Sequence, residues 1–381
     1  MIFKKIQHAI SLALPALVLI LSCAKVNNNN TLTENATLKF TVSGYELLDM
    51  AKDGSWFAGY DVTNHKVAGF SGANGSKIWE YTIPKVWINT YAGPEEVQDW
   101  VRYGAKITDD GNYILLACEY TKTILSKTGT VIFYADSFNY GDISFSLGGP
   151  ADITGDGSYF VQGNPLTLFT QTGQVVWCKA GDQYGSLSNN VAISRNGSYV
   201  ARDYGDVYLY DFSGNLVRRI PDNEIVSHFI KFSPEGDLIF WGGLGGGKVI
   251  DLMGNTIHLE TTNDFYGVSD MAIPESDSLL FVALAGKVKL YTLSSTSSLL
   301  WENDSTPGMV YVDVSSDGSL FGAIGGGYVY IFDRNGQILF SASQDGGSGG
   351  KIIIGGRIRI SANGKYFCAQ GGGGIYYYEM K

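Results

Sequence analysis

Cysteine and histidine are scarce in this chain, and their scarcity limits the chemistry that it can support. The 381 residues include 4 Cys and 4 His, and no CxxC, HxxxH or HExxH spacing occurs. Neither a zinc site nor a redox-active dithiol is indicated, and we predict no metal and no cofactor. Beyond the N-terminal segment, Cys118, Cys178 and Cys368 lie in predicted strands of different repeats. We expect buried thiols, not a disulfide framework.

Positive charge and helical periodicity are also lacking. There are 27 Lys and Arg against 37 Asp and Glu, a formal net charge of −10. An acidic chain is repelled by phosphate backbones, so we predict no nucleic-acid partner. No segment shows a sustained 3.6-residue apolar period with helix caps. The 49 Gly and the 17% of charged residues fit many tight turns, and we therefore predict an all-β fold.

What the sequence does contain is an internal repeat. A turn such as Asp317-Gly318, followed by an apolar, strand-length run, occurs eight times. The eight copies begin at residues 52, 109, 155, 195, 234, 275, 316 and 362. The spacing of the central copies is about 40 residues, which is the period of a four-stranded propeller blade.

A second turn in each repeat occurs only seven times. Its copies are 74–79, 128–133, 172–177, 213–218, 253–258, 296–301 and 335–340. The chain ends at Lys381 before an eighth copy, and Ala36–Ser43 has the pattern of the missing strand. We predict an eight-bladed β-propeller of four-stranded antiparallel blades, closed by an N-terminal strand that completes the C-terminal blade, with seven blades as the alternative.

The N-terminus has the features of an export signal. Two lysines precede an apolar run that is too short to span a membrane, so we interpret residues 1–22 as a signal peptide. The sequence ILSC at its end resembles the lipobox of bacterial lipoproteins, which makes Cys23 the predicted lipid-attachment residue. Residues 23–35 are then a lipidated, flexible tether, and residues 36–381 a single propeller domain.

Two short motifs resemble ligand-binding loops but do not fit them. Residues 242–249 (GGLGGGKV) match GxxxxGK, yet Val249 stands where a P-loop needs Ser or Thr, and a strand follows in place of a helix. Residues 152–157 (DITGDG) bring two carboxylates together, but calcium requires six to eight oxygen ligands. We interpret both as structural turns.

The end of each outer strand carries a bulky residue at a constant position. Aromatic residues occur there at Trp79, Phe133, Trp177, Trp301 and Phe340. Segments 205–218 and 327–340 show the same pattern in full, GDVYLYDFSGNLVR and GYVYIFDRNGQILF. This pattern resembles the pyrroloquinoline-quinone-type (quinoprotein-like) propeller repeats, with WD-repeat propellers as a broader neighbour. The resemblance implies blades that stack through this aromatic, and the chain departs from it at Arg218 and His258.

The resemblance implies two kinds of function. Quinoprotein dehydrogenases contain an adjacent Cys-Cys pair, which this chain lacks; a deep central cavity lined by acids would favour such an enzyme. The barrel-assembly scaffold lipoprotein of the bacterial outer membrane carries similar repeats and no such pair. We therefore predict a non-enzymatic, lipid-anchored envelope scaffold for protein partners, monomeric, at the outer membrane or the cell surface. The alternatives are a glycan- or ligand-binding propeller and, second, a quinone-cofactor dehydrogenase.

Insertions between the repeats indicate where a partner would bind. Residues 84–103, 135–150 and 344–356 are longer than the other connections, and all fall on the face opposite the repeated turns. The candidate partner or ligand residues are the aromatics of the first two: Trp87, Tyr91, Trp100, Tyr103, Phe138 and Tyr140. They could form a binding surface or fold down as a cover over the blades. The nearby acids Glu95, Glu96, Asp99 and Asp142 make this surface acidic, which suits a basic or polar partner, or a sugar.

Overall fold

The computed structural model describes residues 35–91, 93–180, 190–222, 225–262, 267–275, 279–294, 297–304, 311–343 and 357–381. These residues form strands, turns and bends, and none of them is helical. Within the same ranges no helix has the length and apolar character needed to cross a membrane. The predicted signal peptide, Cys23 and the insertion 344–356 lie outside the described residues.

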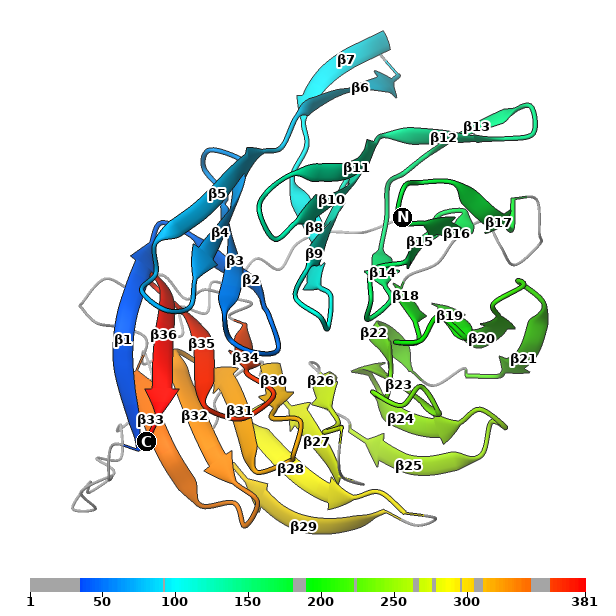
Figure 1. Cartoon of the computed structure of the whole chain (residues 1–381). Coiled ribbons are helices and arrows are strands. Elements are labelled where there is room, and N and C mark those ends of the chain that lie inside the picture. Colours follow the sequence, from blue (N-terminus) through cyan, green and yellow to red (C-terminus); the bar gives the residue numbers. More distant parts are fainter. Residues whose placement is uncertain are drawn as a thin grey trace, which may run out of the picture. The chain divides into compact units, whose positions relative to one another are not determined.

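Eight four-stranded antiparallel sheets are described, arranged as blades of a ring (Figure 1). Blade 1 consists of β2 (Glu46–Met50), β3 (Trp56–Asp61), β4 (Lys66–Ser71) and β5 (Lys77–Thr82). Blade 2 consists of β8 (Val101–Ile107), β9 (Tyr113–Cys118), β10 (Lys122–Ser126) and β11 (Val131–Ala135). Blade 3 consists of β14 (Ala151–Ile153), β15 (Tyr159–Gly163), β16 (Leu166–Thr170) and β17 (Val175–Cys178). Blade 4 consists of β18 (Asn190–Ile193), β19 (Tyr199–Tyr204), β20 (Asp206–Asp211) and β21 (Leu216–Ile220).

The second half of the ring repeats this plan. Blade 5 consists of β22 (Val226–Phe232), β23 (Leu238–Leu244), β24 (Gly246–Asp251) and β25 (Thr256–Thr261). Blade 6 consists of β26 (Val268–Ala272), β27 (Leu279–Leu284), β28 (Lys287–Thr292) and β29 (Ser298–Asn303). Blade 7 consists of β30 (Tyr311–Val314), β31 (Leu320–Gly325), β32 (Tyr328–Asp333) and β33 (Ile338–Ser343). Blade 8 consists of β34 (Ile358–Ile360), β35 (Tyr366–Gly371), β36 (Gly374–Met380) and β1 (Ala36–Ser43).

The strand β1 closes the ring. It pairs antiparallel with β36, from Ala36 opposite Met380 to Ser43 opposite Gly374. The outer edge of the last blade is therefore supplied by the start of the chain, which leaves β36 paired on both sides. The predicted eight-bladed propeller with a shared closing blade is confirmed, and the seven-bladed alternative is wrong.

The repeated turns share a hydrogen-bonded structure that explains why the repeat recurs. The hydroxyl of Thr154 donates to Asp156 Oδ1 (2.8 Å) and accepts the backbone N–H of Tyr159 (3.1 Å). Gly157 adopts a φ of 73°, which favours glycine. The same hydroxyl contacts recur at Thr108, Ser194, Ser315 and Ser361. Of the two acids of the 152–157 motif, Asp156 is bonded within its turn, and Asp152 accepts hydrogen bonds from Lys106 of blade 2 (2.7 Å) and from the backbone N–H of Ile193 of blade 4 (3.0 Å).

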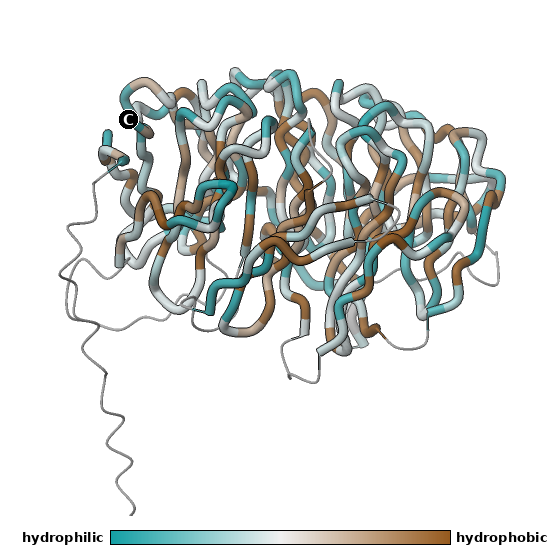
Figure 2. The backbone as a smooth tube through the Cα atoms, turned by 90° about the horizontal axis from the view of Figure 1, so that it is seen from below, coloured by the Kyte–Doolittle hydropathy of each residue, from teal (hydrophilic) through white to brown (hydrophobic). Residues whose placement is uncertain are grey.

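The apolar core lies between neighbouring blades. Phe281 of blade 6, for example, packs edge-on against Phe321 of blade 7, with ring centroids 5.3 Å apart, and both are fully buried. The three described cysteines are buried and free, as expected of small hydrophobic residues. Figure 2 shows the apolar colour on the strands and the hydrophilic colour mainly on the turns of both faces. This packing makes each blade depend on its neighbours.

Candidate functional site

The first insertion forms a two-stranded hairpin that belongs to none of the blade sheets. β6 (Lys85–Thr90) and β7 (Gly93–Gln98) pair only with each other, with Trp87 opposite Glu96. Figure 1 shows the hairpin projecting from the ring between blades 1 and 2. Trp87 is 70% exposed and Tyr91 is fully exposed, whereas Val86, which precedes Trp87 in β6, is buried. The hairpin therefore presents its indole to solvent.

Trp100 and Tyr103 flank the base of this hairpin. They are 43% and 40% exposed. Between them, the guanidinium of Arg102 lies 5.9 Å from the Trp100 ring and 5.5 Å from the Tyr103 ring. Both carboxylate oxygens of Glu119 accept hydrogen bonds from Arg102 Nη1 at 2.7 Å. Both aromatic rings therefore lie within reach of a cation–π contact with the same guanidinium.

A buried carboxylate fixes the base of the hairpin to blade 2. Asp99 is fully buried and accepts hydrogen bonds from the backbone N–H groups of Trp100 (2.9 Å) and Tyr120 (3.1 Å) and from the Thr121 hydroxyl (2.7 Å). Three donors satisfy a charge that would otherwise be costly to bury. Asp99, which the sequence suggested as part of an acidic surface, is therefore an internal anchor.

The second insertion behaves differently. It forms the hairpin of β12 (Ser137–Tyr140) and β13 (Ile143–Ser146). Phe138 stacks on Phe145 of the same hairpin and meets Phe169 of blade 3 edge-on, at 5.4 and 5.0 Å between centroids. Tyr140, near its tip, is 45% exposed. Phe138 thus lies in a cover over blade 3. The first insertion fits the interpretation as a binding surface, and the second fits the interpretation as a cover.

A buried lysine joins this second insertion to blade 2. Lys122 Nζ donates to the carbonyl oxygens of Leu147 (2.6 Å), Cys118 (3.2 Å) and Thr121 (3.2 Å). Its burial lowers the pKa of the amine to about 8. The lysine is enclosed by backbone acceptors and has no exposed surface. We therefore interpret it as a structural residue that fixes the second insertion to blade 2.

The bulky residues at the ends of the outer strands contact the neighbouring blade. The indole Nε1–H groups of Trp79, Trp177 and Trp301 donate to backbone carbonyls of the next blade's outer turn, those of Lys127, Phe212 and Arg334, at 2.9–3.0 Å. The rings lie directly over the glycine of that turn, where a Cβ on Gly129, Gly214 or Gly336 would meet the indole within 3.0 Å. Phe133 lies in the same way over Gly173, and Phe340 packs on Phe367 and Tyr378.

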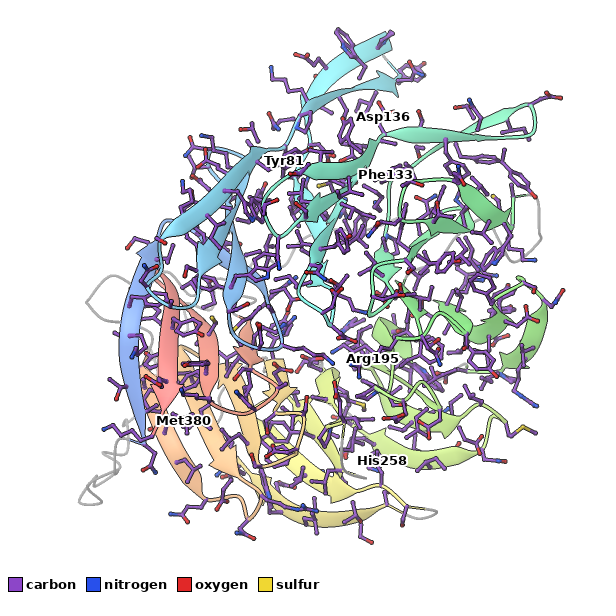
Figure 3. The ribbon with its side chains drawn as sticks, in the orientation of Figure 1. Tyr81, Phe133, Asp136, Arg195, His258 and Met380 are labelled. Carbon is purple, nitrogen blue, oxygen red and sulfur yellow. The ribbon has the colours of Figure 1, made fainter. Side chains whose placement is uncertain are left out.

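Arg218 and His258, which depart from the aromatic pattern, occupy the same position at the joint between neighbouring blades. Arg218 lies over Gly254, and His258 Nδ1 is 2.8 Å from Ser297 Oγ of the next blade. Figure 3 shows Phe133 and His258 at different joints of the ring. An eighth member that sequence reasoning missed is Phe40 of β1, which lies over Gly75. The sequence carried a signal for Phe40, because Ala36–Ser43 was predicted to be an outer strand and outer strands carry such a residue.

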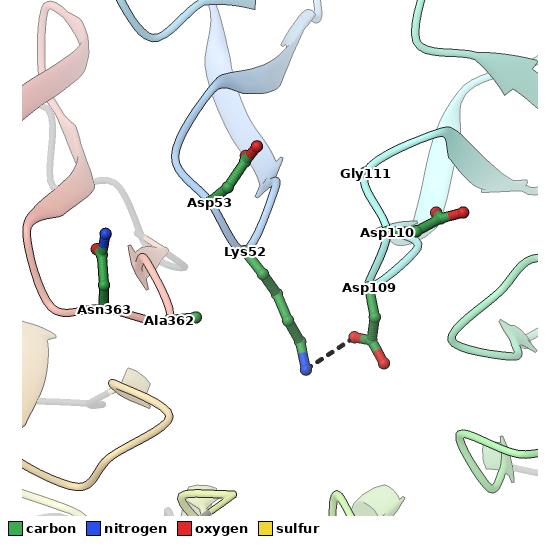
Figure 4. Close-up of a pocket in the computed structure, with 7 residues that line it drawn as sticks. All are labelled: Lys52, Asp53, Asp109, Asp110, Gly111, Ala362 and Asn363. Carbon is green, nitrogen blue, oxygen red and sulfur yellow. Dashed lines mark ion pairs between the residues drawn. The ribbon is translucent and has the colours of Figure 1, made fainter.

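One end of the central channel is crossed by ion pairs. Lys52, Asp109, Arg195 and Glu275 come from the inner turns of blades 1, 2, 4 and 6. Lys52 pairs with Glu275 and, at 2.9 Å, with Asp109, and Arg195 pairs with Asp109 at 2.5 Å and with Glu275 at 3.1 Å. Arg195 lies on the inner side of the ring in Figure 3, and Figure 4 shows Lys52 reaching toward Asp109. A hollow of about 330 Å³ beside these turns is lined by Lys52, Asp53, Asp109, Asp110, Gly111, Ala362 and Asn363.

The other end of the channel contains a larger cavity of about 550 Å³. Its wall is built from inner strands, and its charged residues are Lys106, Lys231, Asp270, Arg357 and Arg359. Ion pairs join Lys106 to Asp152 at 2.7 Å, Lys231 to Asp270 at 2.6 Å and Arg359 to Asp49 at 2.6 Å. The wall is therefore mainly basic, although the chain as a whole is acidic.

Sequence reasoning missed this cavity, although a signal was present. Within six inner strands a charged residue stands five positions before the turn glycine, for example Asp49 before Gly54 and Lys106 before Gly111. The others are Asp152, Lys231, Asp313 and Arg359. Charged residues inside apolar strands are unusual unless they are paired. Among the described residues, no group of three or more His, Cys, Asp or Glu could hold a metal ion.

Comparison with known proteins identifies the fold. No family model matches the chain, and no curated protein matches it in sequence. Among solved structures, the crystal structure of the C-terminal WD40 domain of Sif2 is similar, with a TM-score of 0.68, covering 91% of this chain and 98% of that one. The chain has the fold of a WD40-type β-propeller. At 13% identity the likeness shows the fold alone.

Proposed function

We propose that this protein is a non-enzymatic scaffold for protein–protein interaction, anchored to the bacterial envelope through a lipid on Cys23. Its docking surface is the aromatic surface formed by Trp87, Tyr91, Trp100 and Tyr103. The supporting fold is typical of interaction scaffolds. The finer assignment, to pyrroloquinoline-quinone-type repeats and a role like that of the barrel-assembly scaffold lipoprotein, rests on the repeat pattern and on ILSC at residues 20–23.

The exposure of Trp87 is the observation that carries the proposal. An indole that is 70% exposed, on a hairpin outside the blade sheets, contributes little to the core of the propeller. Burial of such a side chain against a partner would stabilise a complex by about 2 kcal/mol or more, the range of interface hot spots. Tyr91, Trp100 and Tyr103 extend the surface toward blade 2.

The base of the aromatic surface is held in place before a partner binds. Asp99 fixes the backbone at Trp100, and Glu119 fixes Arg102 beside the Trp100 and Tyr103 rings. A surface already in its bound arrangement loses less conformational entropy on association. Exposed Glu95 and Glu96 on β7 add negative charge, which suits a basic or polar partner.

A dehydrogenase is the less supported function. The sequence has no adjacent cysteine pair, and the charged residues that line the central cavity are four cations and one carboxylate, the reverse of an acid-lined site. A glycan-binding role has exposed aromatic platforms in Trp87 and Tyr91, whereas Arg102 lies over Trp100 and Tyr103.

Crosslinking in intact cells, followed by mass spectrometry, tests the scaffold. The natural chain is compared with the double variant Trp87→Ala/Trp100→Ala and with Met253→Ala, which removes an apolar side chain that is 65% exposed on the repeated-turn face of blade 5. We expect envelope proteins to be captured through residues 84–103 by the natural chain and by Met253→Ala, and to be lost from the double variant. In Cys23→Ser we expect acyl labelling to disappear and the protein to leave the membrane fraction.

Capture of no envelope protein above background would contradict the scaffold and make glycan binding at Trp87 the leading question. Equal capture by the double variant would place the docking surface elsewhere. Retention of Cys23→Ser in the membrane fraction would contradict the lipid anchor and leave the docking surface to be judged by the crosslinks alone.

A further inference from the structure

The central cavity lies at the end of the channel opposite a cluster of ion pairs. The ion pairs among Lys52, Asp109, Arg195 and Glu275 cross the end that carries the repeated turns. The cavity lies at the opposite end, where its wall includes Tyr103 and Gly104 at the start of β8. Its volume of about 550 Å³ is within the range of small-molecule sites.

One cation in the wall has no carboxylate partner among the described residues. Lys106, Lys231 and Arg359 each pair with an aspartate, whereas no Asp or Glu oxygen in the described part of the chain lies within 4.0 Å of the Arg357 guanidinium. Arg357 Nη1 donates to the carbonyl of Leu48 at 2.9 Å. Its burial and the like charge of Arg359 lower the pKa of Arg357, and the more distant Asp49 and Asp270 oppose this only in part. An anion in contact with the guanidinium would offset the cost of its burial and the repulsion by Arg359.

The backbone of blade 2 makes room for this guanidinium. Gly104 has a φ of 99° and lies at a β-bulge, where the pairing of β8 with β9 shifts between Val101 and Gly104. A Cβ at this position would lie 3.0 Å from Arg357 Nη2. The strained backbone and the close approach both favour glycine. The bulge thus leaves space beside the cavity for an arginine that reaches across from blade 8.

Apolar surface lies beside this charge. Tyr103, Phe229 and Tyr311 line the same cavity, together with the alanines at positions 105, 117 and 151. Burial raises the pKa of Tyr311, and the nearby Arg357 guanidinium opposes this rise, so the ring lies beside the charge as a neutral phenol. A guanidinium offers several N–H donors in one plane, which fits the two oxygens of a carboxylate. The charge of Arg357 and the apolar wall together fit a ligand that has one anionic end and one apolar part.

We propose that the cavity binds a small organic acid, whose carboxylate pairs with Arg357 and whose apolar part lies against Tyr103, Phe229 and Tyr311. This site shares Tyr103 with the aromatic surface but uses neither Trp87 nor Trp100. The Trp87→Ala/Trp100→Ala variant, which leaves the cavity wall intact, should bind the acid normally. Arg357 variants should still capture partners through the aromatic surface.

The test is a titration of the purified full chain with benzoate and with its neutral isostere benzamide, followed by ligand-observed NMR and by the shift in melting temperature. We expect benzoate to bind at least about tenfold more tightly than benzamide. Arg357→Gln should weaken benzoate binding by about tenfold or more. Arg334→Gln is the matched control, because Arg334 is exposed in the outer turn between β32 and β33 and does not line the cavity, and it should bind benzoate as the natural chain does.

Three results would overturn the proposal. They are equal affinity for benzoate and benzamide, unchanged benzoate affinity in Arg357→Gln, and no binding of benzoate at about 10 mM, well above the affinity expected of a fragment in a formed site. If Arg357→Gln does not fold, Arg357→Lys replaces it, with several-fold weaker binding expected because the planar fork is lost. Natural affinity in a folded Arg357→Lys would then count against the guanidinium contact.

Discussion

Arg218 occupies the outer-strand position at which other blades place an aromatic ring. Its Nε atom is buried and has no hydrogen-bond partner among the described residues. Its Cδ lies 3.1 Å from the place of a Cβ on Gly254, so the side chain covers the turn of blade 5 as the indoles cover theirs. An unsatisfied buried donor costs about 1–3 kcal/mol. The joint between blades 4 and 5 is therefore weaker than those closed by tryptophan.

We predict that Arg218→Trp stabilises the protein by about 1 kcal/mol. The Nε1–H of the new indole can donate to the carbonyl of Leu252, which has the position in its turn that Lys127 and Phe212 have in theirs. Urea unfolding of the two proteins measures the difference. Val217→Trp is the control, since Val217 is 46% exposed on the same strand and should give no such gain. Equal stability of the two tryptophan variants would argue against a docking role for this position.

A second prediction concerns Glu260, which is buried between blades 5 and 6. Burial alone would raise its pKa, but interactions with His258, Tyr291 and Lys289 prevail and lower the pKa from 4.5 to about 2. Tyr291 and Lys289 donate to its two oxygens at 2.5 and 3.0 Å. Between pH 4.5 and 2 the unfolded chain binds the proton more readily, so the stability contributed by Glu260 is present above this window and is lost as the pH falls through it.

Glu260→Gln should therefore lose less stability than the natural chain between pH 4.5 and 2, by on the order of 2–3 kcal/mol. Urea midpoints measured at pH 7, 4.5 and 2.5 show the difference. Glu95→Gln, on the exposed β6–β7 hairpin, should follow the natural chain. Parallel curves for all three proteins would mean that the contacts of Glu260 do not govern acid stability.

At the scale of elements, β1 makes two kinds of contact that close the ring. Phe40 stacks on Tyr377 with centroids 4.9 Å apart and covers Gly75 of blade 1. Lys39 pairs with Glu379 of β36 at 2.7 Å. β1 thus completes blade 8 and also forms the joint between blades 8 and 1.

Deletion of residues 36–43 should lower the melting temperature by on the order of 10 °C, because it exposes the edge of β36 and removes the Phe40 joint. Differential scanning calorimetry of the full chain and the deletion measures this. Deletion of residues 27–34, of equal length and just before the strand, is the control and should leave the melting temperature within about 2 °C. A similar loss in both deletions would attribute the effect to chain length and not to β1.

At the scale of the whole molecule, local signals were enough to predict the ring. Each turn, such as Asp317-Gly318, depends on residues close in sequence, and the mismatch between eight inner and seven outer turns identified Ala36–Ser43 as the closing strand. The cavity could not be predicted in this way, because Lys106 and Arg357 come together only when the ring is closed. Nor could sequence separate Trp87, which is exposed, from Phe138, which packs on blade 3.

The pairing of β1 with β36 also sets the order in which the protein can reach its final state. β1 is the first described strand to be synthesised, and its partner β36 is the last strand of the ring. Blades 1 to 7 can form on the ribosome before β36 has been made, but β1 must wait, unpaired, until β36 follows. A chain that stops before β36 is therefore an open arc with two unprotected edges, which are templates for edge-to-edge aggregation.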